Sequence, residues 1–305
     1  MVLPIMLSFA GPIHASDFDE LNIIADGGNM VKRSYKYKPD IESGSSTWIR
    51  EHSALKVSHI THANSHLKAL NLPTAFDVRT LDPKFPAPYD QGSLGSCTAN
   101  ALAALVQYDN DIEGRPSDTP SRLFICFNER SIEGSVYEDS GASLSTGIRT
   151  LHESGVCKET LWPYNISQFR TRPSKAAFLD ALNNVDLDEN YTSVDHIDQS
   201  LSAIKYVLGV SHRPFVFGIQ IFESFESQQV ARTGIVPMPK PGEQCLGGHA
   251  VLAVGYDDHK GTLTVRNSWG ENWGDHGYFH LPYGYATNPN LALDFWTISK
   301  IGKKV

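Results

Sequence analysis

The sequence predicts an α+β protein of two lobes, because predicted helices precede predicted strands along the chain. Four segments have helical patterns without proline: 97–109, 144–153, 176–182 and 198–208. Pro214 marks a change in composition. Short β-rich runs bounded by Gly, Pro or Asp follow it: 215–221, 250–256, 263–266 and 278–281. Helices in one part of a chain and strands in another are typical of an α+β fold.

Size and charge indicate an ordinary globular protein and exclude one class of partner. The 305 residues are 41% hydrophobic and 20% charged, which is enough for a sizeable core. The formal net charge is −8. Nucleic-acid-binding domains usually carry a basic patch. We therefore expect no nucleic-acid partner.

Residues 1–15 differ from the rest of the chain. They read MVLPIMLSFAGPIHA, carry no charge, and end in a small residue before the polar Ser16. This pattern is typical of a secretory signal peptide, although the usual Lys or Arg near the start is absent. A buried N-terminal strand or a truncated end is the alternative. The signal peptide predicts export, to the cell exterior or to a lysosome-like or periplasmic compartment. No other stretch approaches the ~20 apolar residues that span a bilayer.

Residues 16–71 form a polar N-terminal segment. A short strand is predicted over 54–60, and 32–38 reads KRSYKYK, which is basic and aromatic. Its histidines include His52, His59, His62 and His66. Their spacing fits no common metal-ligand pattern, so a solvated polar segment is favoured over a metal site. The composition changes abruptly at Leu72, which predicts a separate domain over 72–305.

Cys97 stands at the start of the predicted helix 97–109, where a reactive thiol is favoured. A helix N-terminus presents unpaired N–H groups and positive potential, which stabilise a thiolate. The preceding QGSLGS supplies the small residues that a close approach requires. Gln91 can point its amide at a substrate carbonyl and form an oxyanion hole with the Cys97 N–H. Taken alone, a small core cysteine at a helix start is an equal alternative.

His249 is the candidate base. It follows two glycines and precedes the predicted strand 250–256, so we expect it at a strand start. Asn267 comes after a second predicted strand. Two antiparallel strands joined by a turn over 257–261 would bring both residues to one end of the sheet. Asn267 would then hold the imidazole in the required tautomer, and Trp269 would cover their hydrogen bond.

Taken together, these segments resemble the papain-like cysteine peptidases. The nucleophile segment reads QGSLGSCTANA, the histidine segment GGHAVLAVGYDD, and the third and most specific segment RNSWGENWGDHGYF. The resemblance runs from about Leu72 to Ile298 in the family's order. It implies a papain-like two-lobe fold, with a helical left lobe, a β-barrel-like right lobe and the active-site cleft between them. It assigns catalytic roles as follows: Cys97 as nucleophile, His249 as base and then acid, Asn267 as orienter and Gln91 as oxyanion donor.

The resemblance also implies which residues bind substrate: Gly141, Ala142, Leu144, Gly248 and Trp269. In this family the main pocket takes the side chain two residues before the cut. Its expected walls are Leu144, Gly248 and a residue near Thr297 or Ile298. Such a mostly apolar pocket predicts a preference for Leu, Val or Phe.

Several positions depart from the family's pattern. Leu94 stands where many relatives have a cysteine, and Asp139 stands near the place of its disulfide partner, so both halves of that bridge are missing. Thr98 replaces the usual aromatic residue after the nucleophile. Ala142 replaces the second glycine of the cleft, which puts backbone pairing with substrate in question. Every catalytic residue type is present, so the departures indicate a divergent enzyme.

The remaining cysteines are Cys126, Cys157 and Cys245. At most one intramolecular bridge can form among them, and the alternative is three reduced thiols. Asn165 and Asn190 begin sequences that fit the N-glycosylation pattern, which matters only in a host that glycosylates exported chains.

The sequence therefore predicts a secreted cysteine endopeptidase that acts through a thioester acyl-enzyme and needs no metal or organic cofactor. No paired histidines in an inserted loop indicate a carboxypeptidase. Residues 16–71 are predicted to be a propeptide that blocks the cleft as an intramolecular inhibitor, with a permanent N-terminal extension as the alternative. We expect a monomer with peptide or protein substrates. Peptide ligation by the same acyl-enzyme and a non-catalytic peptide-binding protein are the competing functions.

Overall fold

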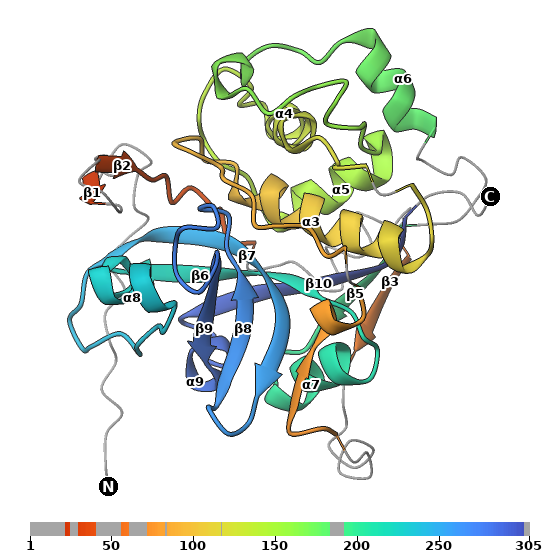
Figure 1. The fold of residues 1–305 in the computed structure, drawn as a ribbon. Coiled ribbons are helices and arrows are strands. Elements are labelled where there is room, and N and C mark those ends of the chain that lie inside the picture. The colour runs from red at the N-terminus through yellow and green to blue at the C-terminus, as the bar shows by residue number, and fades with distance from the viewer. Residues whose placement is uncertain are drawn as a thin grey trace, which may run out of the picture.

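The computed structural model describes residues 22–24, 30–40, 56–60, 72–82, 84–116, 118–183 and 192–301. The predicted signal peptide, residues 1–15, and much of the segment 16–71 lie outside these ranges. Helices α4 (Arg122–Ile132), α5 (Leu144–Ser154) and α6 (Lys175–Asn183) gather on one side of α3 (Cys97–Ile112), and the sheet lies on its other side (Figure 1). The predicted α+β architecture with a helical lobe and a sheet lobe is confirmed.

Helix α3 lies between the two lobes. Its Ala- and Leu-rich sequence favours a helix, and every residue from Cys97 to Asp109 is buried. The pattern over 97–109 predicts this helix, and the structure extends it to Ile112. A helix buried on all sides is held by packing on each face, so the position of its first residue is fixed by both lobes.

Helix α4 is not predicted by the hydrophobic pattern. Its interior carries Asn128, Glu129 and Arg130, all buried, which interrupt the apolar periodicity. The Asn128 amide donates to the Phe124 carbonyl within the helix, whereas Glu129 accepts from the Thr98 hydroxyl of α3 and the Arg130 guanidinium donates to the Phe169 carbonyl. Tertiary contacts thus stabilise a helix that the sequence pattern hides.

The strands form two separate sheets. The larger one has the strand order β3-β5-β10-β6-β7-β8-β9, with β4 paired to β7, and β1 and β2 form the smaller one. The strands are β1 (Asn22–Ile24), β2 (Met30–Lys32), β3 (Lys56–Ile60), β4 (Ala75–Asp77), β5 (Thr192–Ile197), β6 (Phe215–Phe222), β7 (Cys245–Asp257), β8 (Thr262–Arg266), β9 (Tyr278–Pro282) and β10 (Ala292–Ile301). The remaining helical elements are α7 (Leu201–Gly209), α8 (Gln228–Thr233), α9 (Tyr283–Ala286) and the 3₁₀ turns Val78–Thr80, Ile166–Gln168 and Glu223–Glu226.

Strands β6 to β9 correspond to the predicted strands, whereas β5 and β10 are not predicted. Strand β5 reads TSVDHI and β10 reads ALDFWTISKI, so neither is a continuous apolar run. Strand β10 also has register irregularities against both of its neighbours. The predicted strand over 54–60 is present as β3, which pairs in parallel with β5. The N-terminal segment therefore contributes an edge strand to the larger sheet.

The hairpin of β7 and β8 places His249 and Asn267. The two strands are antiparallel, with Leu252 opposite Arg266, so Asn267 follows β8 on the side where β7 carries His249. His249 lies inside β7, because Gly247 and Gly248 continue the extended backbone and Gly248 pairs with Gln220 of β6. The expectation of His249 at a strand start is therefore wrong, while the predicted antiparallel hairpin is confirmed.

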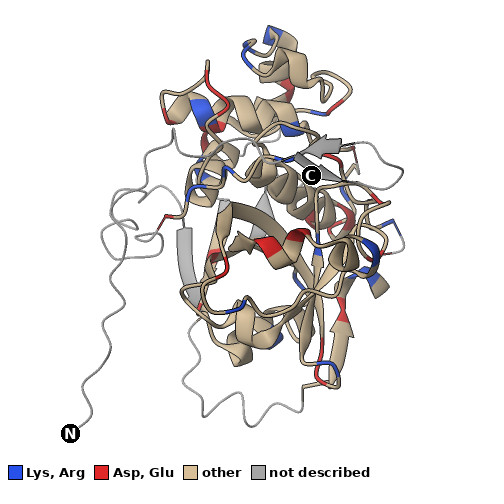
Figure 2. Cartoon of the chain, turned by 90° about the vertical axis from the view of Figure 1, so that its left-hand side faces the viewer, with Lys and Arg blue, Asp and Glu red and all other residues tan. Residues whose placement is uncertain are grey.

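Charged residues of both signs are spread over the two lobes and do not gather into one basic stripe in the view of Figure 2. No helix among the described residues is long and apolar enough to cross a lipid bilayer.

Candidate active site

Cys97 is the first residue of α3, and its side chain is only 1% exposed. Burial raises the pKa of the Cys97 thiol to about 12, while the backbone N–H of Ala250 acts in the opposite direction. Ala250 follows His249 in β7, so the N-terminus of α3 contacts the strand that carries the histidine. Burial of Cys97 therefore disfavours its thiolate.

His249 is fully buried beside Asn267. Its Nε2 lies 2.8 Å from the Asn267 Oδ1, which also accepts from the Ser268 N–H. This contact makes Nε2 the protonated nitrogen of the neutral ring, and Nδ1 has no hydrogen-bond partner among the described residues. Burial lowers the pKa of His249 to about 4, the Asn267 hydrogen bond opposes this shift, and the Arg33 charge adds to it. The free Nδ1 is thus available to a thiol.

Trp269 shields the His249–Asn267 pair. The Trp269 and His249 rings are stacked, with centroids 4.9 Å apart and an interplanar angle of 23°. Tyr35 approaches the His249 ring edge-on at 6.3 Å. The Arg33 guanidinium lies over the face of the Trp269 ring, 4.2 Å from the ring centroid. Two residues of the N-terminal segment therefore add to the cover of the imidazole.

Gln91 is held in the loop before α3 by several hydrogen bonds. Its Nε2 donates to the Leu94 carbonyl at 2.9 Å, and its Oε1 accepts from the Ser268 hydroxyl at 2.6 Å. The Gln91 backbone N–H donates to the Ser268 carbonyl at 2.9 Å. Ser268 is thus a positioning residue that sequence reasoning did not single out, although it is adjacent to Asn267. The arrangement fixes the Gln91 side chain beside the N-terminus of α3.

The segment Arg33–Asp40 lies between the two lobes, directly beside His249. The Tyr37 N–H donates to the Gly248 carbonyl at 3.1 Å, and the Lys38 N–H donates to the Ala142 carbonyl at 3.0 Å. A Cβ at Gly141 would overlap the Lys36 backbone. Four of the expected substrate-binding residues therefore contact this segment, because Trp269 lies against its Arg33 and Tyr35. Figure 1 shows the same path, as the red trace after β2 runs to the junction of α3 and β7.

Ion pairs anchor the segment Arg33–Asp40 to both lobes. Arg33 pairs with Glu226 at 2.8 Å, and both side chains are almost fully buried. Lys36 pairs with Asp139 at 2.9 Å, and Lys38 pairs with Glu133 at 2.5 Å, in more exposed positions. The basic character of KRSYKYK could have indicated acidic partners, but the sequence does not tell which acids they are.

The positions that depart from the family's pattern form contacts of their own. Asp139 Oδ1 accepts from the Gly95 N–H at 2.9 Å, so a hydrogen bond joins the two loops that the missing disulfide would connect. The Thr98 hydroxyl donates to the buried Glu129 at 2.9 Å, and burial raises the pKa of that carboxyl to about 8. The Ala142 carbonyl accepts the backbone hydrogen bond of the Lys38 N–H, so the methyl group of Ala142 does not prevent backbone pairing with this segment.

The structure also describes Leu144, Thr297 and the remaining cysteines. Leu144 begins α5 and is fully buried in the core. The Thr297 hydroxyl donates to the Pro214 carbonyl at 2.8 Å. All four cysteines are unpaired, so the alternative of reduced thiols at Cys126, Cys157 and Cys245 is the one found.

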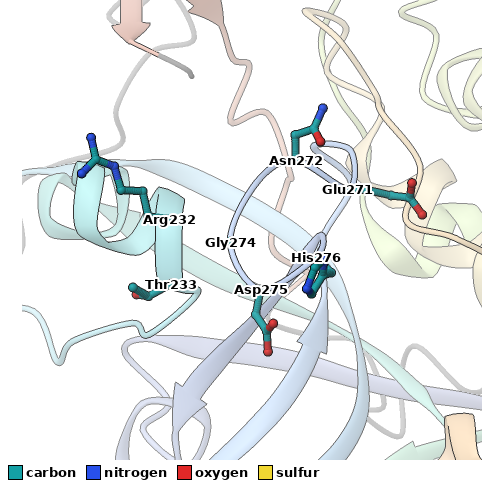
Figure 3. A pocket seen from close by; sticks show the side chains of 7 residues that line it. All are labelled: Arg232, Thr233, Glu271, Asn272, Gly274, Asp275 and His276. Atoms are coloured by element: carbon teal, nitrogen blue, oxygen red, sulfur yellow. The ribbon is translucent and has the colours of Figure 1, made fainter. Parts of the chain in front are cut away.

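The candidate catalytic residues do not line the polar surface pocket that Figure 3 shows. In the part of the chain that the structure describes, no group of His, Cys, Asp or Glu side chains could hold a metal ion. His52, His62 and His66 lie outside that part. A polar pocket of about 410 Å³ opens beside α8 (Figure 3). It is lined by Arg232, Thr233, Glu271, Asn272, Gly274, Asp275 and His276, none of which is an expected site residue.

A comparison with protein families identifies the domain that carries this geometry. Residues 72–294 match the family described as papain family cysteine protease. The chain belongs to this family. The match begins at Leu72, the residue at which the composition of the sequence changes.

Individual relatives support the same assignment for this papain-family protease. It is 41% identical to an uncharacterized peptidase C1-like protein of Acanthamoeba polyphaga mimivirus, over 90% of this chain and 89% of that one. It is 27% identical to pro-cathepsin H of Mus musculus, over 70% of this chain and 61% of the other. The crystal structure of xylellain, a cysteine protease from Xylella fastidiosa, matches with a TM-score of 0.75 and 38% identity. That match covers 88% of this chain and 96% of xylellain.

The Asn267–His249 contact leads to a testable prediction. Replacing Asn267 by alanine should lower kcat about ten- to a hundredfold, because the imidazole loses the bond that fixes its tautomer but the thiol remains. That hydrogen bond raises the pKa of His249, so the alkaline limb of the pH–rate profile should move to lower pH. Asn272→Ala, in the surface pocket, is the control. A pH profile that does not move would contradict the positioning role.

Proposed function

We propose that this papain-family protease is an endopeptidase made as an inactive precursor, in which residues 16–71 are the propeptide and 72–305 the catalytic domain. The observation that carries the proposal is the path of Arg33–Asp40. Its backbone bonds to Gly248 in one lobe and Ala142 in the other, on either side of the candidate catalytic residues. A peptide substrate needs that same backbone pairing, so it cannot bind while the segment is in place.

The chemistry begins with the thiol and the imidazole. In the uncovered enzyme, the His249 Nδ1 takes the proton of the Cys97 thiol, and the thiolate attacks the carbonyl carbon of the scissile peptide bond. The negative charge that develops on the carbonyl oxygen is stabilised by the Cys97 N–H and the Gln91 side-chain amide. The Asn267 Oδ1 accepts a hydrogen bond from the protonated Nε2, which keeps Nδ1 directed at the thiol and stabilises the imidazolium.

Two proton transfers complete the cycle. The His249 imidazolium gives its proton to the leaving amine, the C–N bond breaks, and the acyl group stays on Cys97 as a thioester. Water then attacks the thioester while the neutral His249 takes a proton from it. The C–S bond breaks, which releases the acid product and restores the Cys97 thiolate beside the His249 imidazolium. No metal or organic group takes part in these steps.

The segment suppresses this chemistry in two ways. It occupies the backbone positions that substrate needs, and it buries Cys97 and His249. Burial raises the pKa of Cys97 to about 12 and lowers that of His249 to about 4. Both shifts favour a neutral thiol and a neutral imidazole, so the ion pair that reacts is disfavoured until the segment leaves.

Further parts of the proposal rest on sequence alone. Residues 1–15 are proposed to direct export, after which the chain acts as a monomer on peptide or protein substrates outside the cytosol or in an acidic organelle. The endopeptidase assignment rests on the absence, from the sequence, of an inserted loop with paired histidines.

The precursor is tested by comparing the chain that starts at Ser16 with the chain that starts near Leu72, each alongside its Cys97→Ala form. We expect hydrolysis of fluorogenic peptides under reducing conditions only by the short chain with Cys97 intact. Equal hydrolysis by both lengths would leave the peptidase in place and remove the inhibitory role of 16–71. Hydrolysis by neither, without labelling of Cys97, would favour a peptide-binding protein.

The pH dependence of thiol labelling gives a second readout of the same experiment. With the segment bound, the raised pKa of Cys97 makes the thiolate scarce at neutral pH, so labelling by iodoacetamide should keep increasing above pH ~9. After cleavage of the segment, labelling should already be fast near pH 7. The Cys97→Ala chain corrects for the exposed Cys245. Identical pH profiles before and after cleavage would show that the segment does not cover Cys97.

A further inference from the structure

Tyr37 of the N-terminal segment fills a pocket next to the candidate catalytic residues. Only 4% of the side chain is exposed, and its ring lies against Gly218 of β6 and Gly248 of β7. A Cβ at either glycine would overlap Tyr37 atoms. The register of β6 and β7 puts both glycines on the same face of the sheet, so together they leave a space that a large side chain can enter.

The bottom of this Tyr37 pocket is a buried carboxylate. The Tyr37 hydroxyl donates to the Asp294 Oδ2 at 2.6 Å, and Asp294 is 5% exposed. The Asp40 N–H donates to the same oxygen at 3.3 Å, and the Trp296 indole N–H donates to Oδ1 at 3.2 Å. The donors from Tyr37 and Asp40 belong to the N-terminal segment and leave with it.

The backbone of β10 is distorted at Asp294. The register of β10 against β6 shifts between Leu293 and Trp296, and Asp294 has a φ of 66°. This irregularity turns the carboxylate toward the pocket, as β-bulges commonly do beside functional sites. A left-handed non-glycine residue is strained and persists only where the surrounding structure holds it. Burial also raises the pKa of Asp294 to about 6.

We propose that Asp294 is a specificity-determining residue that selects substrates whose side chain in the Tyr37 pocket ends in a hydrogen-bond donor, namely Tyr, Arg or Lys. This inference rests on the proposed function. An aliphatic side chain or Phe in the pocket would leave the carboxylate without the donors that the segment supplied, and the loss of donors to a buried carboxylate is costly. The apolar preference for Leu, Val or Phe that the sequence indicates is therefore replaced by a polar one.

The residues of β10 explain why the sequence indicated a different wall. Thr297 bonds to Pro214 and Ile298 is buried in the core, whereas the Asp294 carboxylate bonds to the Tyr37 hydroxyl. Because the register of β10 against β6 is irregular, the residue that meets Tyr37 is Asp294. The regular alternation of side chains along a strand does not predict this.

Matched peptides test the preference. The full chain is cleaved in its N-terminal segment by an added protease, and kcat/KM is measured for peptides that differ at one position at a time over the three residues before the cut. At one of these positions, we expect kcat/KM to be about tenfold or more higher for the peptide with Tyr than for the one with Phe. The same difference is expected for Arg over Leu. Tyr and Phe differ by a single hydroxyl, and Arg and Leu test the charged donor.

Variants of Asp294 identify the group responsible. Asp294→Asn is the first choice, because asparagine tolerates a positive φ and keeps the shape of the side chain. It should reduce the Arg-to-Leu ratio by about tenfold or more. Asp294→Gly, which also fits the backbone, should do the same. Asp275→Asn, in the pocket of Figure 3, should leave the ratio unchanged. Ratios that are equal in the wild type, or unaltered in both Asp294 variants, would overturn the inference.

A second measurement does not depend on turnover. In the full chain carrying Cys97→Ala, cleavage of the N-terminal segment by added protease reports how often the segment leaves. Tyr37→Phe should speed this cleavage about tenfold, and the effect should largely disappear in the Asp294→Asn background. An equal effect of Tyr37→Phe in both backgrounds would overturn the recognition of the hydroxyl by Asp294. An inactive chain that still shows this coupling would contradict the proposed peptidase and leave the pocket assignment intact.

Discussion

Alanine in place of Cys97 is expected to lower kcat/KM for peptide hydrolysis by at least about 10⁴-fold in the cleaved enzyme, because no other group on α3 can form the acyl-enzyme. The thiol is placed by the buried start of α3 and by its proximity to β7, so the substitution removes the nucleophile without disturbing the helix. Alanine is also a good helix former. The remaining rate should come only from substrate binding and the oxyanion donors.

Two controls separate loss of the nucleophile from loss of the fold. Cys245→Ala removes the exposed thiol and should retain full activity. His249→Ala should lose activity to a similar extent as Cys97→Ala, since the two groups act as a unit, and the double variant should be hardly worse than either single one. Activity of the Cys97→Ala enzyme above about a hundredth of the wild type would overturn the assignment of the nucleophile.

The second large effect is expected at Arg33. This residue lies over Trp269 and pairs with Glu226, and the two side chains are 5% and 7% exposed. Replacing Arg33 by alanine leaves Glu226 buried without its cation, and loss of one partner of a buried pair costs about 2–5 kcal/mol. We therefore expect the segment to leave the cleft at least about thirtyfold more often. The uncleaved Arg33→Ala chain should hydrolyse peptides and label at Cys97 correspondingly faster.

Lys38→Ala is the matched control for Arg33→Ala. It removes another cation of the same segment, but its pair with Glu133 is partly exposed, at 43% for the lysine and 16% for the glutamate. Exposed pairs contribute about 0–1 kcal/mol, so opening should change by a few-fold at most. Circular dichroism and thermal unfolding of both variants establish that the domain is folded. If both substitutions had the same effect on labelling of the uncleaved chain, the buried Arg33–Glu226 pair would not be the anchor.

The contacts of the departing positions are consistent with a divergent member of the papain family. The two loops that lack a disulfide are joined by the Asp139–Gly95 hydrogen bond, and Asp139 also pairs with Lys36 of the segment. When the segment leaves, Asp139 keeps the loop contact and loses the lysine. The same residue therefore takes part in holding the cleft loops together and in holding the segment in the cleft.

Local chemistry made much of the fold and the site predictable from sequence. The helix of Cys97 follows from an Ala- and Leu-rich run, and the hairpin that joins His249 to Asn267 follows from two β-rich runs and a turn. Segments with buried polar side chains were not predictable in this way. The apolar pattern of helix α4 is interrupted by Asn128, Glu129 and Arg130. Glu129 and Arg130 can be buried because Thr98 and Phe169, from other parts of the chain, hydrogen-bond to them.

By itself, the sequence determined the papain-like fold class and the motifs around the four candidate catalytic residues, because each depends on neighbours in the chain. Only the tertiary structure decided which segment lies between the lobes and which residue meets the Tyr37 hydroxyl. The Arg33–Glu226 pair and the Tyr37–Asp294 bond join residues far apart in sequence, so no local pattern marks them. The position of Asp294 depends in addition on an irregular strand, because a shift of register moves a different side chain into the same place.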